Sequence, residues 1–130
     1  MTTGELAHVD LTDVERRLLL AGLMEYGGPA AGAVVLAPIV GAENVDAFFQ
    51  LTDRLAAAIK KREPLSDLDW ARALVLAEIC WASDLLGAAS DFATNMPDEV
   101  ALPTLRSLQR KLVTGERVQA LIGLRQRGSD

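Results

Sequence analysis

The sequence has very few residues that carry catalytic or metal chemistry: one cysteine, Cys80, and one histidine, His8, in 130 residues. A single cysteine excludes an internal disulfide, and a lone thiol in an unstapled core is typical of a reducing compartment. A single histidine excludes the histidine-rich metal sites of helical bundles and argues against Ser–His–Asp or Cys–His catalysis. We therefore expect no catalytic residue, no metal and no cofactor, and we expect the protein not to be an enzyme.

Aromatic residues are also scarce, at 5% of the chain, although half of all residues are hydrophobic. The core must therefore consist mostly of leucine, valine, isoleucine and alanine. Alanine and leucine are strong helix formers, whereas the aromatic residues that favour strands are few. A chain of 130 residues is close to the commonest size of one domain. This composition predicts a single all-α domain.

Long hydrophobic runs are absent as well. The longest apolar stretch, residues 29–42, is too short to span a bilayer and is interrupted by glycine and by Pro38. The N-terminal sequence, MTTGELAHVD, has neither the basic start nor the apolar run of a signal peptide. We expect no membrane association and a cytoplasmic location.

The net charge is −5, which disfavours a broad nucleic-acid interface because binding there depends on neutralising phosphates. From Pro103 onward, however, the chain carries six lysine or arginine residues and two acids. This basic segment either packs against acidic helices of the same molecule or recruits an acidic partner. A helix-turn-helix over residues 30–53 would place Asp46 and Asp53 near phosphates, so a DNA-binding regulator is the least favoured function.

Helical periodicity and capping signals predict a bundle of five or six helices over residues 11–126, with flexible ends at residues 1–10 and 127–130. Thr12 and Glu15 form a capping box at the start of a helix that runs to about Tyr26. Further helices are expected over residues 44–61, from about residue 95 and from about residue 116. Residues 30–40 are interpreted as a short apolar helix that ends near Pro38 and Gly41, because a lone strand would have no partner.

The longest predicted helix covers about residues 66–93 and starts at a second capping signal, Ser66 with Asp69. Its apolar residues occupy nearly the whole circumference. A helix that is apolar all round is normally surrounded by protein. We therefore place this helix at the centre of the bundle.

Glu78 falls within an apolar arc of this central helix and is expected to be substantially buried. A buried carboxylate must be paired, hydrogen-bonded or protonated, because an isolated buried charge is too costly. Its expected partners are Arg17, Arg106 and Arg110. Glu78 would act either as an internal ion pair that fixes the helix register or as the polar anchor of a ligand pocket.

Three other residues of the central helix complete the candidate binding set. Trp70 and Trp81 lie eleven residues apart and are expected in the core, although an exposed tryptophan would be a strong interface residue. Asp84 shares a helix face with Asp91 and either borders a groove or simply faces water. The candidate binding residues are Glu78, Trp81, Asp84, Trp70, Arg106 and Arg110.

The sequence favours a binding function over catalysis. The high apolar content of a short chain predicts a regulatory or adaptor protein that acts through protein–protein interaction, with a second copy of itself as one partner. The alternative is a small-molecule sensor or carrier with a pocket beside the central helix, lined by Glu78, the two tryptophans and Phe48 or Phe49. Helical bundles serve both functions, so the fold alone does not choose between them.

Overall fold

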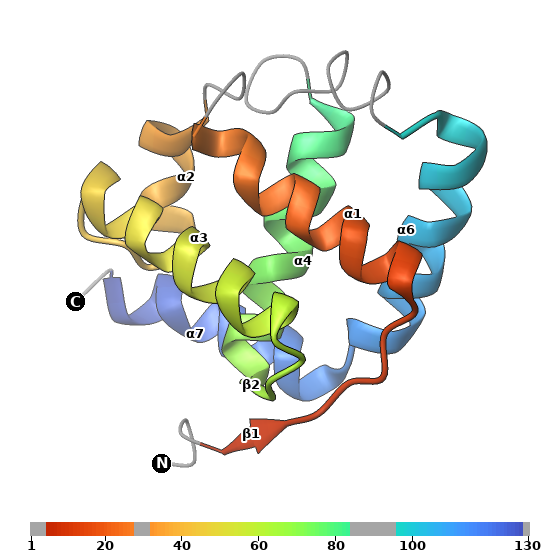
Figure 1. Ribbon diagram of the computed structural model, residues 1–130. Helices are drawn as coiled ribbons and strands as arrows, with labels where there is room; N and C mark the ends of the chain where they lie inside the picture. The colour runs from red at the N-terminus through yellow and green to blue at the C-terminus, as the bar shows by residue number, and fades with distance from the viewer. Residues whose placement is uncertain (1–4, 28–31, 84–95, 129–130) are drawn as a thin grey trace.

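Figure 1 shows the computed structural model, which describes residues 5–27, 32–83 and 96–128. Six α-helices occupy these ranges, which confirms the predicted all-α bundle. In chain order the elements are β1 (Leu6–Ala7), α1 (Asp13–Met24), the 3-10 turn η1 (Glu25–Gly27), α2 (Ala33–Ile39), α3 (Val45–Lys60), β2 (Leu65–Ser66), α4 (Asp67–Ala82), α6 (Asp98–Leu112) and α7 (Gly115–Gly128).

Helix α4 is the central helix, as the sequence predicted. Helices α1, α6 and α7 all pack against it, and Figure 1 shows α1 crossing in front of it. Ala82 is its only exposed residue, and the other residues from Asp67 to Trp81 are buried or half-buried. A helix in contact with three others needs apolar residues around most of its circumference, and this need accounts for the pattern in the sequence.

The predicted end of this helix, near residue 93, is wrong. Helix α4 ends at Ala82, and Ser83 follows with extended backbone angles after its N–H bonds to the carbonyl of Ile79. Serine and aspartate compete for nearby backbone groups and are weak helix formers, so the Ser83–Asp84 pair favours a helix end. Residues 84–93 of the predicted helix lie outside the described residues.

The helix starts confirm both capping signals. In α1 the Thr12 hydroxyl accepts from the N–H of Glu15 at 3.1 Å, and the Glu15 carboxylate accepts from the N–H of Thr12 at 2.8 Å. In α4 the Ser66 hydroxyl accepts from the N–H of Asp69 at 3.2 Å. These side chains satisfy backbone donors that have no partner inside the helix.

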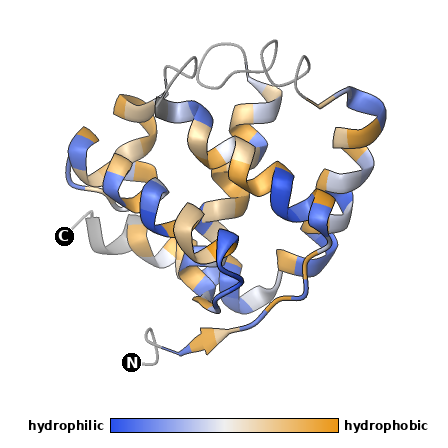
Figure 2. Ribbon diagram, viewed as in Figure 1, coloured by the Kyte–Doolittle hydropathy of each residue, from blue (hydrophilic) through white to orange (hydrophobic). Residues whose placement is uncertain are grey.

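Helix α2 confirms the short apolar helix expected over residues 30–40. All seven of its residues are apolar, and Figure 2 shows the helix as mostly hydrophobic. Pro38 lies in the last turn, and Gly41 ends the segment with a positive φ of 81°. Glycine adopts this left-handed conformation without the steric cost that a side chain would bring.

The two C-terminal helices differ slightly from their expected ranges. Helix α6 begins at Asp98, close to the expected start, and continues through Pro103. Pro103 and Glu99, the residue whose carbonyl loses its helical partner, are both exposed, so water can replace the lost hydrogen bond. Helix α7 begins at Gly115 and extends to Gly128, past residue 126, where the bundle was expected to end.

The segment before α1 was expected to be loose, but part of it is tied to the bundle. Leu6 and Ala7 pair antiparallel with Leu65 and Ser66 to form β1 and β2. The indole N–H of Trp70 donates to the carbonyl of Ala7 at 2.9 Å. These contacts place the chain entering α1 against the start of α4.

Helices α1 and α4 approach each other closely at Gly22. A Cβ atom on Gly22 would lie 2.8 Å from the Cα and 2.9 Å from the Cβ of Ala77. Both distances are far below van der Waals contact, and one of the two atoms belongs to the backbone. The glycine in α1 is therefore required by the packing of α1 on α4, despite its low helix propensity.

We expect Gly22→Ala to lower the free energy of unfolding by about 1–3 kcal/mol, because overpacking costs more than the gain in helix propensity returns. Gly115→Ala is the matched control, since nothing lies within 4 Å of a Cβ added there. We expect this control to be neutral or slightly stabilising. Chemical denaturation of both variants measures the difference. Equal stability of the two variants would contradict the close contact of α1 with α4.

Candidate functional site

Helix α2 presents an apolar face to solvent. Val34, Val35, Pro38 and Ile39 are all exposed, with Val34 at 72%, whereas Leu36 and the two alanines of the helix are buried. Surface helices of globular domains normally place charged or polar residues on the solvent side. The outer face of α2 is therefore typical of a surface that another molecule covers.

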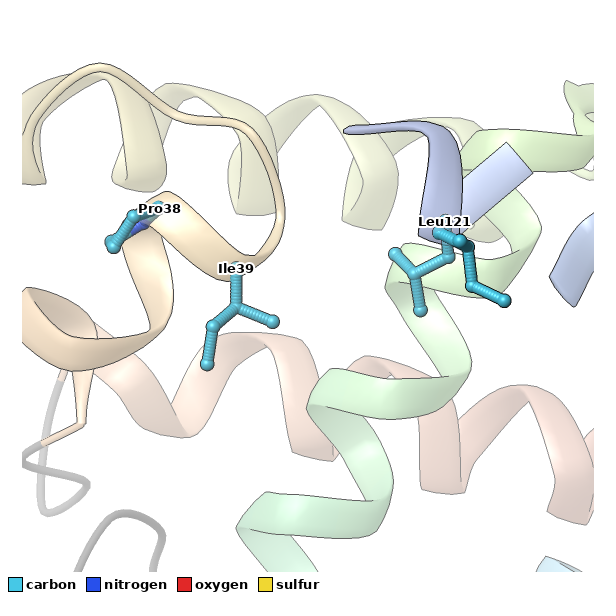
Figure 3. A pocket seen from close by; sticks show the side chains of 4 residues that line it. Pro38, Ile39 and Leu121 are labelled. Carbon is cyan, nitrogen blue, oxygen red and sulfur yellow. The ribbon is translucent and has the colours of Figure 1, made fainter. Parts of the chain in front are cut away.

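This face borders an open hollow of about 550 Å³ between α2 and α7. Pro38 and Ile39 line it from α2, and Leu121 and Ile122 line it from α7. Figure 3 shows Pro38 and Ile39 on one side and Leu121 on the other. The four described lining side chains are all apolar, so this part of the hollow offers an occupant mainly the burial of apolar surface.

A second hollow of about 190 Å³ lies between α4 and α7, next to the end of α6. It shares Leu121 and Ile122 with the first hollow, so the two are contiguous along α7. Most of its lining side chains are apolar, and Glu78 and Arg117 are the charged ones. Exposed valines at 113 and 118 extend the apolar surface beside it. We call the exposed apolar surface of α2 and α7 around the two hollows the α2–α7 face.

Glu78 is half-buried on the wall of the second hollow. Its Oε2 atom accepts a hydrogen bond of 2.6 Å from the side-chain amide of Gln109. The Arg106 guanidinium donates in turn to the amide oxygen of Gln109 at 2.9 Å. A direct salt bridge between Glu78 and an arginine, which the sequence predicted, is absent from the residues that the structure describes.

The position of Gln109 on α6 explains this difference. The buried face of α6 carries Leu105, Leu108 and Leu112, and Gln109 is half-buried beside it. Arg106 and Arg110 are exposed. The short amide side chain at the edge of the buried face therefore reaches Glu78, and Arg106 interacts with it only through Gln109.

The structure does not gather the remaining candidate binding residues into one site. Trp70 is 2% exposed, which confirms its prediction as a core residue, and Trp81 is half-buried against the core. These two tryptophans lie eleven residues apart, or roughly 16 Å along α4. Asp84 lies outside the described residues. Glu78 borders the hollow of about 190 Å³, whereas Trp70 borders a separate and much smaller hollow near Val9 and Leu11.

Glu15 is a buried carboxylate whose sequence context indicates only its place in a capping box. Glu15 is 2% exposed and accepts a hydrogen bond of 2.6 Å from Lys111 and another from the Ser107 hydroxyl. Burial alone would raise the pKa of Glu15, but the hydrogen bonds, led by that from Lys111, outweigh burial and lower the pKa to about 2. This cluster ties the start of α1 to the last turns of α6.

A second missed cluster surrounds Asp69. Arg54 binds both of its carboxylate oxygens, at 2.8 and 3.1 Å, and Arg72 binds one at 2.9 Å. Although burial favours the neutral acid, these hydrogen bonds lower the pKa of Asp69. Arg72 also donates to the carbonyl of Val40 at 2.8 Å, so the cluster joins α3, α4 and the end of α2.

A third missed residue, Arg117, joins α7 to the rest of the bundle. It is 8% exposed and donates to Asp67 at 3.0 Å and to the carbonyls of Lys111 and Leu112 at 3.2 Å each. A guanidinium at these carbonyls satisfies acceptors at the end of α6 that have no helical partner. Arg117 is one of the basic C-terminal residues, and its contacts agree with the expectation that this segment packs against acidic helices of the same molecule.

Comparison of the chain with protein-family models, with curated proteins and with solved structures finds no match. Within residues 5–27, 32–83 and 96–128, no group of three potential metal ligands is close enough together to hold an ion. No helix within the same ranges has the length and hydropathy needed to cross a membrane.

The buried Glu15 carboxylate predicts a specific pH dependence of stability. A carboxyl group whose pKa is lowered by folding stabilises the protein above its ordinary pKa of 4.5, and this contribution is lost as the pH falls toward 2. We expect the free energy of unfolding to fall less steeply between pH 4.5 and pH 2 in Glu15→Gln than in the wild type.

At pH 7 we expect Glu15→Gln to cost about 1–3 kcal/mol, because the partners of a buried charge lose their ionic acceptor. Glu43→Gln is the control, since it replaces an exposed carboxylate and should change stability by less than about 0.5 kcal/mol. Chemical denaturation across this pH range provides the measurement. Parallel pH profiles for the wild type and Glu15→Gln would contradict the account of this cluster.

Proposed function

We propose that the protein acts by protein–protein interaction, in a regulatory or adaptor role, and that its α2–α7 face binds the same face of a second copy. The observation that carries the proposal is the exposed apolar side of α2, where four outward residues in a seven-residue helix are apolar. Full burial of a valine or isoleucine side chain contributes about 1.5–3 kcal/mol. Covering several such residues supplies a substantial driving force for association.

The distribution of charge favours this face as the place where two copies meet. The chain carries a net charge of −5, so two copies repel each other through most of their surfaces. Among the described residues, those that line the larger hollow of the α2–α7 face are all apolar. In a two-fold symmetric dimer each patch meets its own copy, and an uncharged apolar patch meets itself without like-charge repulsion.

The second candidate function is small-molecule binding in the hollow beside Glu78. The observation that favours it is a carboxylate on the wall of an otherwise mostly apolar hollow of about 190 Å³. A cavity of about 150 Å³ is enough to hold benzene, whereas typical ligand pockets measure about 300–1,000 Å³. The hollow is therefore small for a drug-sized ligand, and we rank this function below self-association.

The proposal predicts that Ile39→Asp converts a dimer to a monomer. The substitution places a carboxylate in the apolar face of each copy, and we expect it to weaken dimerisation by more than about tenfold, which corresponds to 1.4 kcal/mol. Light scattering on a size-exclusion column at two salt concentrations measures the mass. The wild-type dimer should persist at the higher salt concentration, because salt screens repulsion between acidic copies.

Leu102→Asp on α6 is the matched control for this experiment. Leu102 is 43% exposed and Ile39 is 48% exposed, so both substitutions add one charge at an exposed apolar position. We expect Leu102→Asp to remain dimeric. A wild-type protein that is monomeric throughout, or equal weakening by the two substitutions, would refute the proposal.

A further inference from the structure

A concentration of positive charge lies on another part of the molecule, where α1 meets the end of α3. A shallow hollow of about 430 Å³ is lined there by four cations, Arg16, Arg17, Lys60 and Arg62, and by one acid, Asp13. Among the described residues that line this hollow, cations therefore outnumber acids by three, in a chain whose net charge is −5. No described residue lines both this hollow and the larger hollow of the α2–α7 face.

Asp13, the one acid among the described lining residues, forms only weak pairs with Arg16 and Arg62. Asp13 is 91% exposed, and its carboxylate lies 3.5 Å from Arg16 and 3.4 Å from Arg62. Pairs this long and this exposed contribute little to stability. Lys60 forms no hydrogen bond or salt bridge with any residue that the structure describes.

Arg16 has a buried hydrogen-bond donor, a feature that surface charge alone does not explain. Its side chain is only 13% exposed, and its Nε donor is buried without an acceptor among the described residues. Buried donors are nearly always hydrogen-bonded, because an unpaired one costs about 1–3 kcal/mol. Arg16 thus holds a donor in need of an acceptor beside a hollow that attracts anions.

The cations at the end of α3 exceed what the helix itself requires. Lys60 lies in the last turn, where a positive charge favours the negative end of the helix dipole. Arg62 lies beyond the helix and adopts a left-handed φ of 61°, a conformation that normally favours glycine. An arginine at this position brings a guanidinium to Asp13 and to the hollow at a cost in backbone energy.

The remaining wall of the hollow is apolar. Leu20, Ala21 and Met24 line it from α1, and Met24 is 59% exposed. A ligand that matches both parts of the hollow has an anionic group for the cations and an apolar body for this wall. Phosphate monoesters carry close to two negative charges at pH 7 and three acceptor oxygens, which suit a cluster of arginines and a lysine.

We propose that this hollow binds a small organic anion of the phosphate-monoester class, with the phosphate at Arg16, Lys60 and Arg62 and the apolar group against Met24. The proposal is independent of self-association through the α2–α7 face. The proposed ligand binds in the hollow between α1 and the end of α3, and its binding requires no catalytic step.

Titration of the full chain with phenyl phosphate, followed by NMR chemical shifts, tests this proposal. We expect saturable binding, with the largest shifts at residues of the hollow. The double variant Lys60→Gln/Arg62→Gln should weaken binding by about tenfold or more, because it removes two of the four cations. Lys60→Gln alone should weaken binding less, and it leaves the backbone of Arg62 untouched.

Lys61→Gln/Arg110→Gln is the matched control, since it removes the same two charges at exposed positions that do not line the hollow. We expect this control to bind phenyl phosphate as the wild type does. Equal weakening in both double variants, or no saturable binding to the wild type at millimolar ligand, would overturn the proposal. Equal affinity for inorganic phosphate would overturn the role of the apolar wall.

Discussion

The crossing of α1 over α4, at the contact between Gly22 and Ala77, is the constraint on which the rest of the bundle depends. It brings the two backbones so close that only glycine fits on α1. With α1 in that position, α6 packs against both helices and α7 covers another side of α4. Helix α2 packs mainly against α3 and reaches the centre only through residues such as Leu36, so its other side faces solvent. The central packing therefore leaves the α2–α7 face as apolar surface outside the core.

Much of this fold was predictable because its signals are local. The Thr12 capping box, the helical spacing of α3 and the all-round apolar pattern of α4 each depend on residues close together in the sequence. The apolar segment before Gly41 was assigned to a helix because a lone strand would have had no partner, and α2 confirms the assignment. The end of α4 was not predictable to the same degree. An apolar pattern that continues past Ser83 does not reveal where the backbone becomes extended.

The candidate site was harder to predict because its contacts join distant parts of the chain. Glu15 looked like a local cap, and nothing near it in the sequence indicates that Lys111 lies 2.6 Å away. Glu78 was expected to be substantially buried and paired with an arginine, yet it is half-buried and its partner is Gln109. Periodicity assigns a residue to a helix face, but the helix that packs against that face follows from tertiary structure. The same limit applies to the exposed side of α2, since the sequence indicated a short apolar helix but not which of its residues face solvent.

The central claim is that a second copy of the chain covers the α2–α7 face. Isotope-filtered NMR on an equimolar mixture of ¹³C-labelled and unlabelled protein tests this claim most directly, because it detects only contacts between copies. The account predicts intermolecular NOEs to the methyl groups of Val34, Val35 and Ile39 on α2 and of Ile122 on α7. Intermolecular NOEs confined to other surfaces, or none at protein concentrations where the wild type is dimeric by mass, would contradict it.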